Sequence, residues 1–271
     1  MLNFKNHPQR LALLGLLLGL GLGKLEAGWA TPFSVSPVRV YFAGRTNTGL
    51  LTVKNPNPNP VRLQLSTFSW DQSSDGKTLL APTEDIIAFP LLLNLQPGEE
   101  RKLRLGTKVP PGEREKAYRV FVEELPTIEP PAQQSAATQI NFLLRLDIPI
   151  FVAPAKSVVK GEVENLAVRS GRVSFQLKNT GNVHFATNNF NIKGYSPDGK
   201  VVFEGHPKIG YILGGRTKTF DLDLPAKDCS KANAIVVEVT AQPSNSGQQS
   251  QLRKAIALPK NACVSPKTPV S

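Results

Sequence analysis

The stretch Gln139–Val152, QINFLLRLDIPIFV, constrains the fold of this chain more than any other segment. Every second position from Ile140 to Val152 is apolar, while the opposite face carries the polar residues Gln139, Asn141, Arg145 and Asp147. A period of two places the apolar side chains on one face of an extended strand. Such a strand reaches roughly 40 Å, whereas a typical sandwich strand covers about 17 to 20 Å. We therefore predict that part of the row overhangs its own domain, the alternative being burial in a single core.

The first thirty residues carry the features of a secretory signal peptide. Lys5 and Arg10 precede an apolar run at 11–23, and small residues follow it. Thirteen apolar residues are too few for a membrane helix, so we predict export, with cleavage after Ala30 or, as second choice, after Ala27. No later segment is apolar enough to span a bilayer, which predicts that the protein does not insert into a membrane.

Removal of residues 1–30 leaves 271 − 30 = 241 residues, the size of two sandwich domains of roughly 100 residues each. The removed part holds three basic residues and one acidic residue, so the net charge changes from +11 to +11 − 2 = +9. The basic residues are scattered, with the densest cluster at 101–104, and no aromatic platform accompanies them. We therefore expect no nucleic-acid binding.

Cys229 and Cys263 are the only cysteines, and disulfides persist in exported proteins. Between them, two β-type runs, Ala234–Thr240 and Leu252–Leu258, flank a turn-rich stretch that contains the midpoint, residue 246. A hairpin folded there would bring both cysteines to the same open end. A disulfide, contributing roughly 3 to 4 kcal/mol, is therefore our preferred interpretation over free thiols or a metal site.

The rest of the chain alternates short β-type runs with Pro, Gly and Asn breaks, and no helical period is convincing. Before the cysteine hairpin and beside Gln139–Val152, the expected strands are Ser34–Phe42, Gly49–Lys54, Val61–Trp70, Ile86–Phe89, Glu99–Leu105, Tyr118–Leu125, Gly161–Leu166, Arg172–Asn179, Asn188–Tyr195, Val201–Glu204 and Thr217–Leu222. Residues 127–138 suggest a long loop. We predict an all-β chain of two immunoglobulin-like sandwiches at 31–154 and 155–271, joined by a short hinge.

Several segments together are similar to one known family. They are VRVYF at 38–42, LQPGE at 95–99, YRVFVEELP at 118–126, IFVAP at 150–154, KNTGNVH at 178–184 and the cysteine hairpin. In order and spacing they resemble the PapD-like periplasmic chaperones of pilus assembly, over nearly the whole of residues 31–271. The pattern is closest to a divergent branch of that family.

The resemblance implies donor-strand complementation, a form of β-augmentation. A pilus subunit lacks its last strand, and the chaperone's long strand fills the resulting groove with alternate side chains. By position, these are Ile140, Phe142 and Leu144, with Leu146 and Ile148 extending the set. The resemblance further implies a periplasmic location, pilus subunits as clients and an outer-membrane usher that receives them.

Members of the family also hold the client's C-terminal carboxylate with two basic residues. The first position falls on Arg39, whose planar guanidinium suits a carboxylate. The second falls on Pro149, which cannot make this contact, so that Arg145 and Lys156 become the candidates. Glu115 matches the acidic member of the family's interdomain ion network, although the usual partner of that residue is missing.

Two other classes of protein were weighed against this interpretation. An enzyme is disfavoured because no catalytic motif occurs, and His184 and His206 fit turn or strand-end positions better than ligand positions. An exported adhesion or carbohydrate-binding sandwich would need exposed aromatic side chains, but the only tryptophans are Trp29, in the signal, and Trp70. We expect no enzymatic activity, no metal and no cofactor.

Overall fold

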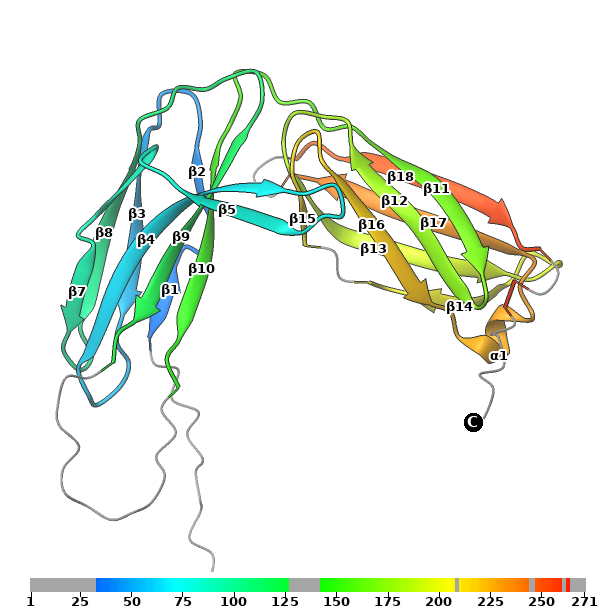
Figure 1. Ribbon diagram of the computed structural model, residues 1–271, viewed down its shortest axis with the longest axis horizontal. Helices are drawn as coiled ribbons and strands as arrows, with labels where there is room; N and C mark the ends of the chain where they lie inside the picture. Colours follow the sequence, from blue (N-terminus) through cyan, green and yellow to red (C-terminus); the bar gives the residue numbers. More distant parts are fainter. Residues whose placement is uncertain (1–32, 127–141, 208–209, 244–246, 260–261, 264–271) are drawn as a thin grey trace, which may run out of the picture. The chain divides into compact units, whose positions relative to one another are not determined.

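The computed structural model describes residues 33–126, 142–207, 210–243, 247–259 and 262–263. The predicted signal peptide with its two cleavage sites, the predicted loop at 127–138 and Ile140 lie outside these residues. Residues 32–271 belong to one unit, and nearly all of its regular structure is β-strand (Figure 1). Within the described ranges, no helix has the length and apolar character needed to cross a membrane.

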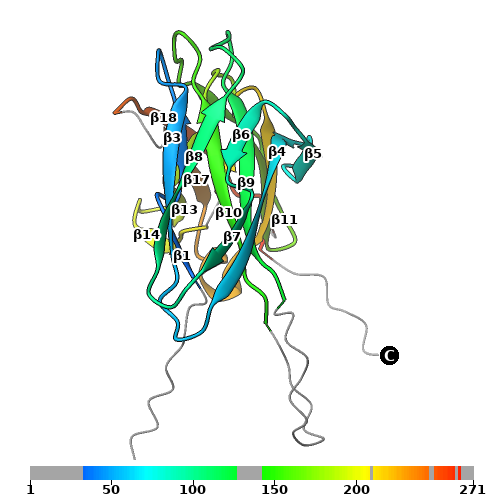
Figure 2. The ribbon, with the colours of Figure 1, turned by 90° about the vertical axis from the view of Figure 1, so that its left-hand side faces the viewer.

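The first sandwich has two sheets. One follows the order β1-β3-β8-β6, which are Ser34–Ser36, Thr48–Lys54, Glu100–Thr107 and Ile86–Phe89. The other follows β2-β10-β9-β4-β5, which are Val40–Phe42, Arg145–Val152, Lys116–Glu124, Val61–Gln72 and Thr78–Pro82, with β7 (Leu92–Leu95) also paired to β4. Figure 2 shows β3 and β8 in front of β9 and β10, as two layers. Alternate apolar side chains of both layers form one core.

The second sandwich has its own core between two further sheets. One contains β11 (Gly161–Arg169), β12 (Arg172–Asn179) and β16 (Thr217–Asp223) in that order. The other follows β14-β13-β17-β18, which are Val201–Gly205, Phe185–Tyr195, Ala234–Gln242 and Ser250–Ala257, and β15 (Tyr211–Ile212) pairs with β13. The predicted all-β architecture of two sandwiches is confirmed, while the boundary between residues 154 and 155 stays a prediction.

Some predicted elements differ from the observed ones. Ser34–Phe42 is not one strand but two, β1 and β2, which belong to different sheets on either side of Pro37. The strands β5, β7 and β15 were not predicted. Nor was the short helix α1 (Ala226–Cys229), which a sequence period cannot reveal because it has only one turn.

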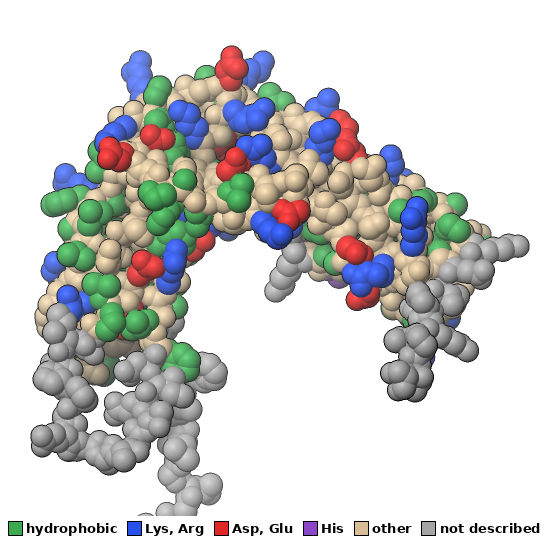
Figure 3. All heavy atoms as spheres, viewed as in Figure 1, with side chains coloured by type: hydrophobic (Ala, Val, Ile, Leu, Met, Phe, Trp, Pro, Cys, Tyr) green, Lys and Arg blue, Asp and Glu red, His purple; other side chains and the backbone are tan. Residues whose placement is uncertain are grey.

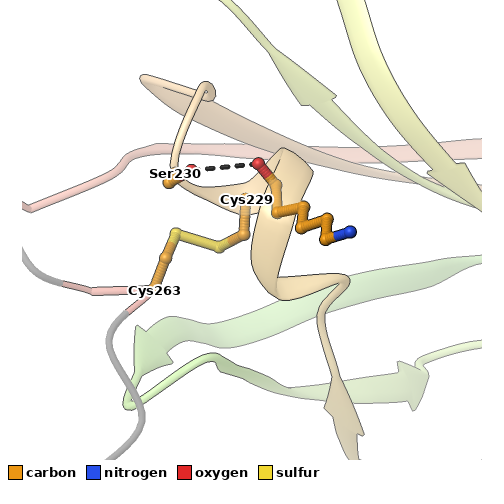
Figure 4. The surroundings of a disulfide bond; sticks show 4 residues. Cys229, Ser230 and Cys263 are labelled. Atoms are coloured by element: carbon orange, nitrogen blue, oxygen red, sulfur yellow. Dashed lines mark hydrogen bonds between the residues drawn. A yellow bond between two sulfur atoms is a disulfide. The ribbon is translucent and has the colours of Figure 1, made fainter.

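The predicted hairpin and its disulfide are both present. β17 pairs antiparallel with β18, with Ala234 opposite Ala257. Cys229 ends α1 and Cys263 follows β18, and a disulfide joins them across a Cα–Cα distance of 5.6 Å (Figure 4). The bond therefore fastens the open end of the hairpin to α1, where the hydroxyl of Ser230 donates to the carbonyl of Lys227.

Candidate functional site

The strand expected over Gln139–Val152 is shorter in the structure. β10 begins at Arg145, and Phe142 to Leu144 form no strand, so that part of the prediction is wrong. The cause is the length of the neighbouring strand. β9 ends at Glu124, whose amide donates to the carbonyl of Leu144 at 2.9 Å, and no described strand continues beside the residues that precede Leu144.

The apolar row of this segment divides into an open part and a sealed part. Phe142 is 87% exposed, whereas Leu144 and Leu146 are half-buried against the first core. Ile148 and Ile150 are 3% and 0% exposed and belong to the core itself. The role of Ile148 in the groove-filling set stays a prediction, and its side chain is already buried in the core of its own sandwich.

One edge of β10 is largely unpaired. β9 pairs with β10 along the whole of Arg145–Val152. On the opposite edge, β2 runs parallel to β10 and covers only Ile150 to Val152. From Arg145 to Pro149, this edge has no partner among the described strands. Pro149 fits such a place because proline, which lacks an N–H group, is tolerated at sheet edges.

The same sheet has a second face, which we call the outer face and which carries Tyr41 on β2, Pro149 and Phe151 on β10, Arg119 on β9 and Trp70 on β4. These residues alternate with core residues such as Val40, Ile150 and Tyr118, so their side chains point away from the first core. Phe151 stacks on Tyr41 and lies beside Trp70, with ring centroids 5.6 and 5.9 Å apart. The outer face is therefore a mainly aromatic surface.

The predicted anchor Arg39 lies immediately before β2 and is exposed. Val40 on β2 pairs with Ile150 on β10 in a parallel register. One residue earlier on both strands, Arg39 therefore lies beside Pro149. Within the described ranges, no carboxylate lies within salt-bridge distance of the Arg39 guanidinium.

The two candidates for the second basic residue are placed less favourably. Arg145 lies four positions before Pro149, pairs with Glu123 at 3.1 Å and covers the ring of Phe121. Lys156 lies beyond the end of β10 and is exposed. Neither side chain is next to Pro149.

Arg119, which sequence reasoning missed, lies directly opposite Pro149 on β9. Its side chain is 12% exposed, its guanidinium lies 3.5 Å from the centroid of the Trp70 ring, and it donates to Asp147 at 3.0 Å. Burial lowers the pKa of Arg119, and the charge of Asp147 opposes this shift. Only the strand register reveals this residue, because nothing in the sequence relates position 119 to position 149.

Three buried polar atoms of the outer face lack hydrogen-bond partners within the part of the chain that the structure describes. They are Oη of Tyr41, Nε1 of Trp70 and Nε of Arg119, and each can donate. A buried donor without an acceptor costs about 1 to 3 kcal/mol, so the outer face carries three donors that its own side chains leave unsatisfied. The burial of Trp70 also removes the exposed aromatic platform that a carbohydrate-binding sandwich would need.

Glu115 has a partner that the sequence did not indicate. Its Oε1 accepts a hydrogen bond from the amide of His184 at 2.9 Å and lies 2.8 Å from Nδ1 of the same residue, both side chains being buried. The His184 ring stacks on Phe151 with centroids 3.7 Å apart. His184 does precede a strand, as expected, but it joins the two sandwiches. Among the described residues, no group of three or more His, Cys, Asp and Glu side chains is arranged to hold a metal ion.

Comparison with known proteins agrees with this fold. Residues 32–157 match the family described as pili and flagellar-assembly chaperone, PapD N-terminal domain. No curated protein sequence matches the chain. The first sandwich thus matches the N-terminal domain of the PapD-like pilus chaperones, and the resemblance that the sequence motifs predicted is confirmed.

Solved structures of pilus chaperones share the fold of both sandwiches. One is the complex of the CsuC chaperone with the CsuE tip adhesion subunit from archaic chaperone-usher Csu pili of Acinetobacter baumannii, at 20% identity and a TM-score of 0.56, covering 82% of this chain and 97% of that one. The CupB2 chaperone of Pseudomonas aeruginosa matches at 20% identity and a TM-score of 0.51. The match covers 82% of this chain and 100% of that one. The structure of the Salmonella enterica SafA pilin in complex with the SafB chaperone matches at 18% identity and a TM-score of 0.50. The match covers 83% of this chain and 96% of that one.

Proposed function

We propose that this protein is a periplasmic chaperone that binds pilus subunits by donor-strand complementation and delivers them to an outer-membrane usher. In this proposal β10 lends its unpaired edge to the unfinished sheet of a subunit, while Phe142, Leu144 and Leu146 enter the groove of the subunit. Ile140, which precedes them in the same row, has the same role.

The observation that carries the proposal is the division of one apolar row into a buried part on β10 and a more exposed part that precedes it. Ile148 and Ile150 fix β10 in its own core, while the preceding apolar side chains and the Arg145–Pro149 edge remain uncovered. Full burial of an apolar side chain of this size contributes about 1.5 to 3 kcal/mol. Phe142 has most of that energy still to gain, and Leu144 and Leu146 have part of it.

A carboxylate anchor on the outer face would fix the register of the client. Arg39 supplies one guanidinium that has no ion pair with any described residue, and Arg119 supplies a second across from Pro149. In this proposal Arg119 takes the role that the sequence left to Arg145 or Lys156. The unpartnered Nε of Arg119 and the hydroxyl of Tyr41 are further donors for the same carboxylate.

The decisive experiment is co-expression of the tagged protein with a pilus subunit of its own organism in the periplasm, followed by co-purification. Phe142→Asp should abolish the 1:1 complex, because a carboxylate cannot enter an apolar groove without a large desolvation cost. The matched control is Leu143→Asp, since Leu143 is also exposed but belongs to the other face of the segment. This control should retain the complex.

Equal capture of the subunit by both variants would refute strand donation. Arg39→Ala tests the anchor separately: the free protein should stay folded, while the steady-state level of the subunit in the periplasm falls. Normal subunit levels in that variant would count against Arg39 as an anchor.

A further inference from the structure

We infer that Gln72 is a positioning residue for client capture, although it lies away from β10 and touches no client in the proposed mode. It acts through Tyr211 of the second sandwich, whose ring is held against the outer face. This inference rests on the proposed function and deepens it, because it names what holds the carboxylate-binding surface in place.

Gln72 bridges the two sandwiches with both polar atoms of its side chain. Its Nε2 donates to the carbonyl of Tyr211 at 2.9 Å, and its Oε1 accepts from the amide of Leu213 at 2.9 Å. The residue is only 7% exposed. Gln72 therefore fixes the backbone on either side of Ile212, and a buried side chain with both hydrogen bonds satisfied leaves that backbone little freedom.

The fixed segment places one aromatic ring on the outer face. The Tyr211 ring packs edge-on against Trp70 at 5.6 Å and lies beside Phe151 at 5.6 Å. The centroid of the Tyr211 ring also lies 6.0 Å from the guanidinium of Arg119. The same guanidinium lies over the ring of Trp70. Tyr211 and Trp70 together thus set the orientation of the guanidinium that we assign to the client carboxylate.

The hairpin that carries Gln72 is fastened to the second sandwich at two more points. Asp71 accepts two hydrogen bonds from Arg216, one of them at 2.6 Å. The turn of the hairpin also lies against Lys218, where a Cβ on Gly76 would come within 2.6 Å of the lysine side chain, so glycine is required there. Both contacts are more exposed than Gln72. Within its own sandwich the Tyr211 backbone pairs with β13, and from the first sandwich Gln72 donates to its carbonyl.

The test uses the purified mature protein and two synthetic peptides with the sequence of the C-terminal strand of a pilus subunit, one ending in a free carboxylate and one in a carboxamide. Isothermal titration gives the ratio of the two affinities. We expect a wild-type ratio of tenfold or more in favour of the free acid. Gln72→Leu should lower the ratio to threefold or less, whereas Gln64→Leu, an exposed glutamine on the same strand, should leave it unchanged.

If Gln72 only holds the two sandwiches together, Gln72→Leu should lower the affinity for both peptides equally and leave their ratio unchanged. That result would overturn the inference. Gln72→Glu provides a second variant if Gln72→Leu does not fold, because it keeps the acceptor for Leu213 and loses only the donor to Tyr211. Its ratio should also fall, and an unchanged ratio again overturns the inference. A wild-type ratio near one overturns the carboxylate anchor itself, so failure of the proposed function is recognised before any variant is measured.

Discussion

The two sandwiches have similar cores but treat their surfaces differently. Ten of the twelve exposed large apolar side chains among the described residues belong to residues 38–143, and only Val158 and Val201 lie in the second sandwich. In the space-filling view, hydrophobic side chains reach the surface of the first sandwich between lysines and arginines (Figure 3). The three buried polar atoms that lack partners within the described ranges also belong to the first sandwich.

The second sandwich is instead closed by a covalent bond. Its last hairpin pairs over the whole of Ser250–Ala257, and the disulfide fastens the open end. Exposed apolar patches and unsatisfied donors are unusual in a protein that works alone. The difference agrees with our proposal that the first sandwich binds the client, while residues of the second sandwich pack against the outer face.

The largest expected effect falls on the second sandwich. Replacement of both Cys229 and Cys263 by Ser should cost about 4 kcal/mol, because the bond closes a loop of 34 residues in the unfolded chain. Hydrogen exchange in denaturant, followed by mass spectrometry, should show early exchange in β17 and β18, while β3 and β8 of the first core exchange later. If both sandwiches respond at the same denaturant concentration, they unfold as one unit, and the disulfide does not stabilise the second sandwich separately.

The next effect separates Ile150 on β10 from Phe142, which precedes the strand in the same apolar row. Ile150→Ala should lower the free energy of unfolding by about 3 kcal/mol, because it leaves a cavity in the first core. Phe142→Ala should change it by less than about 0.5 kcal/mol, because the ring is exposed. Urea denaturation measures both. A large loss in Phe142→Ala would mean that this ring serves the fold rather than a client.

A smaller effect is expected for the second basic residue. Arg119→Gln should weaken binding of the client peptide with a free carboxylate by about 1.5 kcal/mol, the loss of one charged hydrogen bond. Arg145→Gln is the control, since Arg145 already pairs with Glu123. Isothermal titration of both variants measures the difference. A larger loss in the control would return the anchor to Arg145.

The smallest effect concerns the pH dependence of the first sandwich. Burial and a 2.8 Å hydrogen bond to Asp85 raise the pKa of Tyr118 well above its ordinary value. A raised pKa in the folded state gives stability below the ordinary value of about 10, and this stability is lost as the pH rises further. Tyr118→Phe should cost about 1 kcal/mol at pH 8 and lose less stability than the wild type between pH 8 and pH 11. Urea denaturation at both pH values tests this, and equal losses would contradict it.

The sequence was sufficient for elements whose period and breaks agree. Ile86–Phe89 and Arg172–Asn179 have the predicted bounds. The first is a short apolar run that ends at Pro90, and the second alternates polar and apolar side chains after Gly171. β5 was missed because all its residues are exposed and its two leucines are adjacent, which hides the alternation. The start of β10 was misplaced because a period of two describes side-chain direction, whereas a strand also needs a neighbour to pair with.

The site could be predicted only where its residues are consecutive. Phe142, Leu144 and Leu146 follow from one alternating run. Arg119 and Gln72 could not be found in that way, because their importance depends on a cross-strand register and on a contact 139 residues away along the chain. His184 as partner of Glu115 was missed for the same reason.

Pro149 has a consequence for any strand that docks beside β10. A strand that docks on this edge gains main-chain hydrogen bonds as more of its residues pair, so pairing would normally extend along the whole edge. At Pro149 no N–H group is offered, and from Ile150 onward β2 already occupies the edge. Pairing of the incoming strand therefore ends at Pro149, and the strand can extend only in the direction of Arg145 and Phe142.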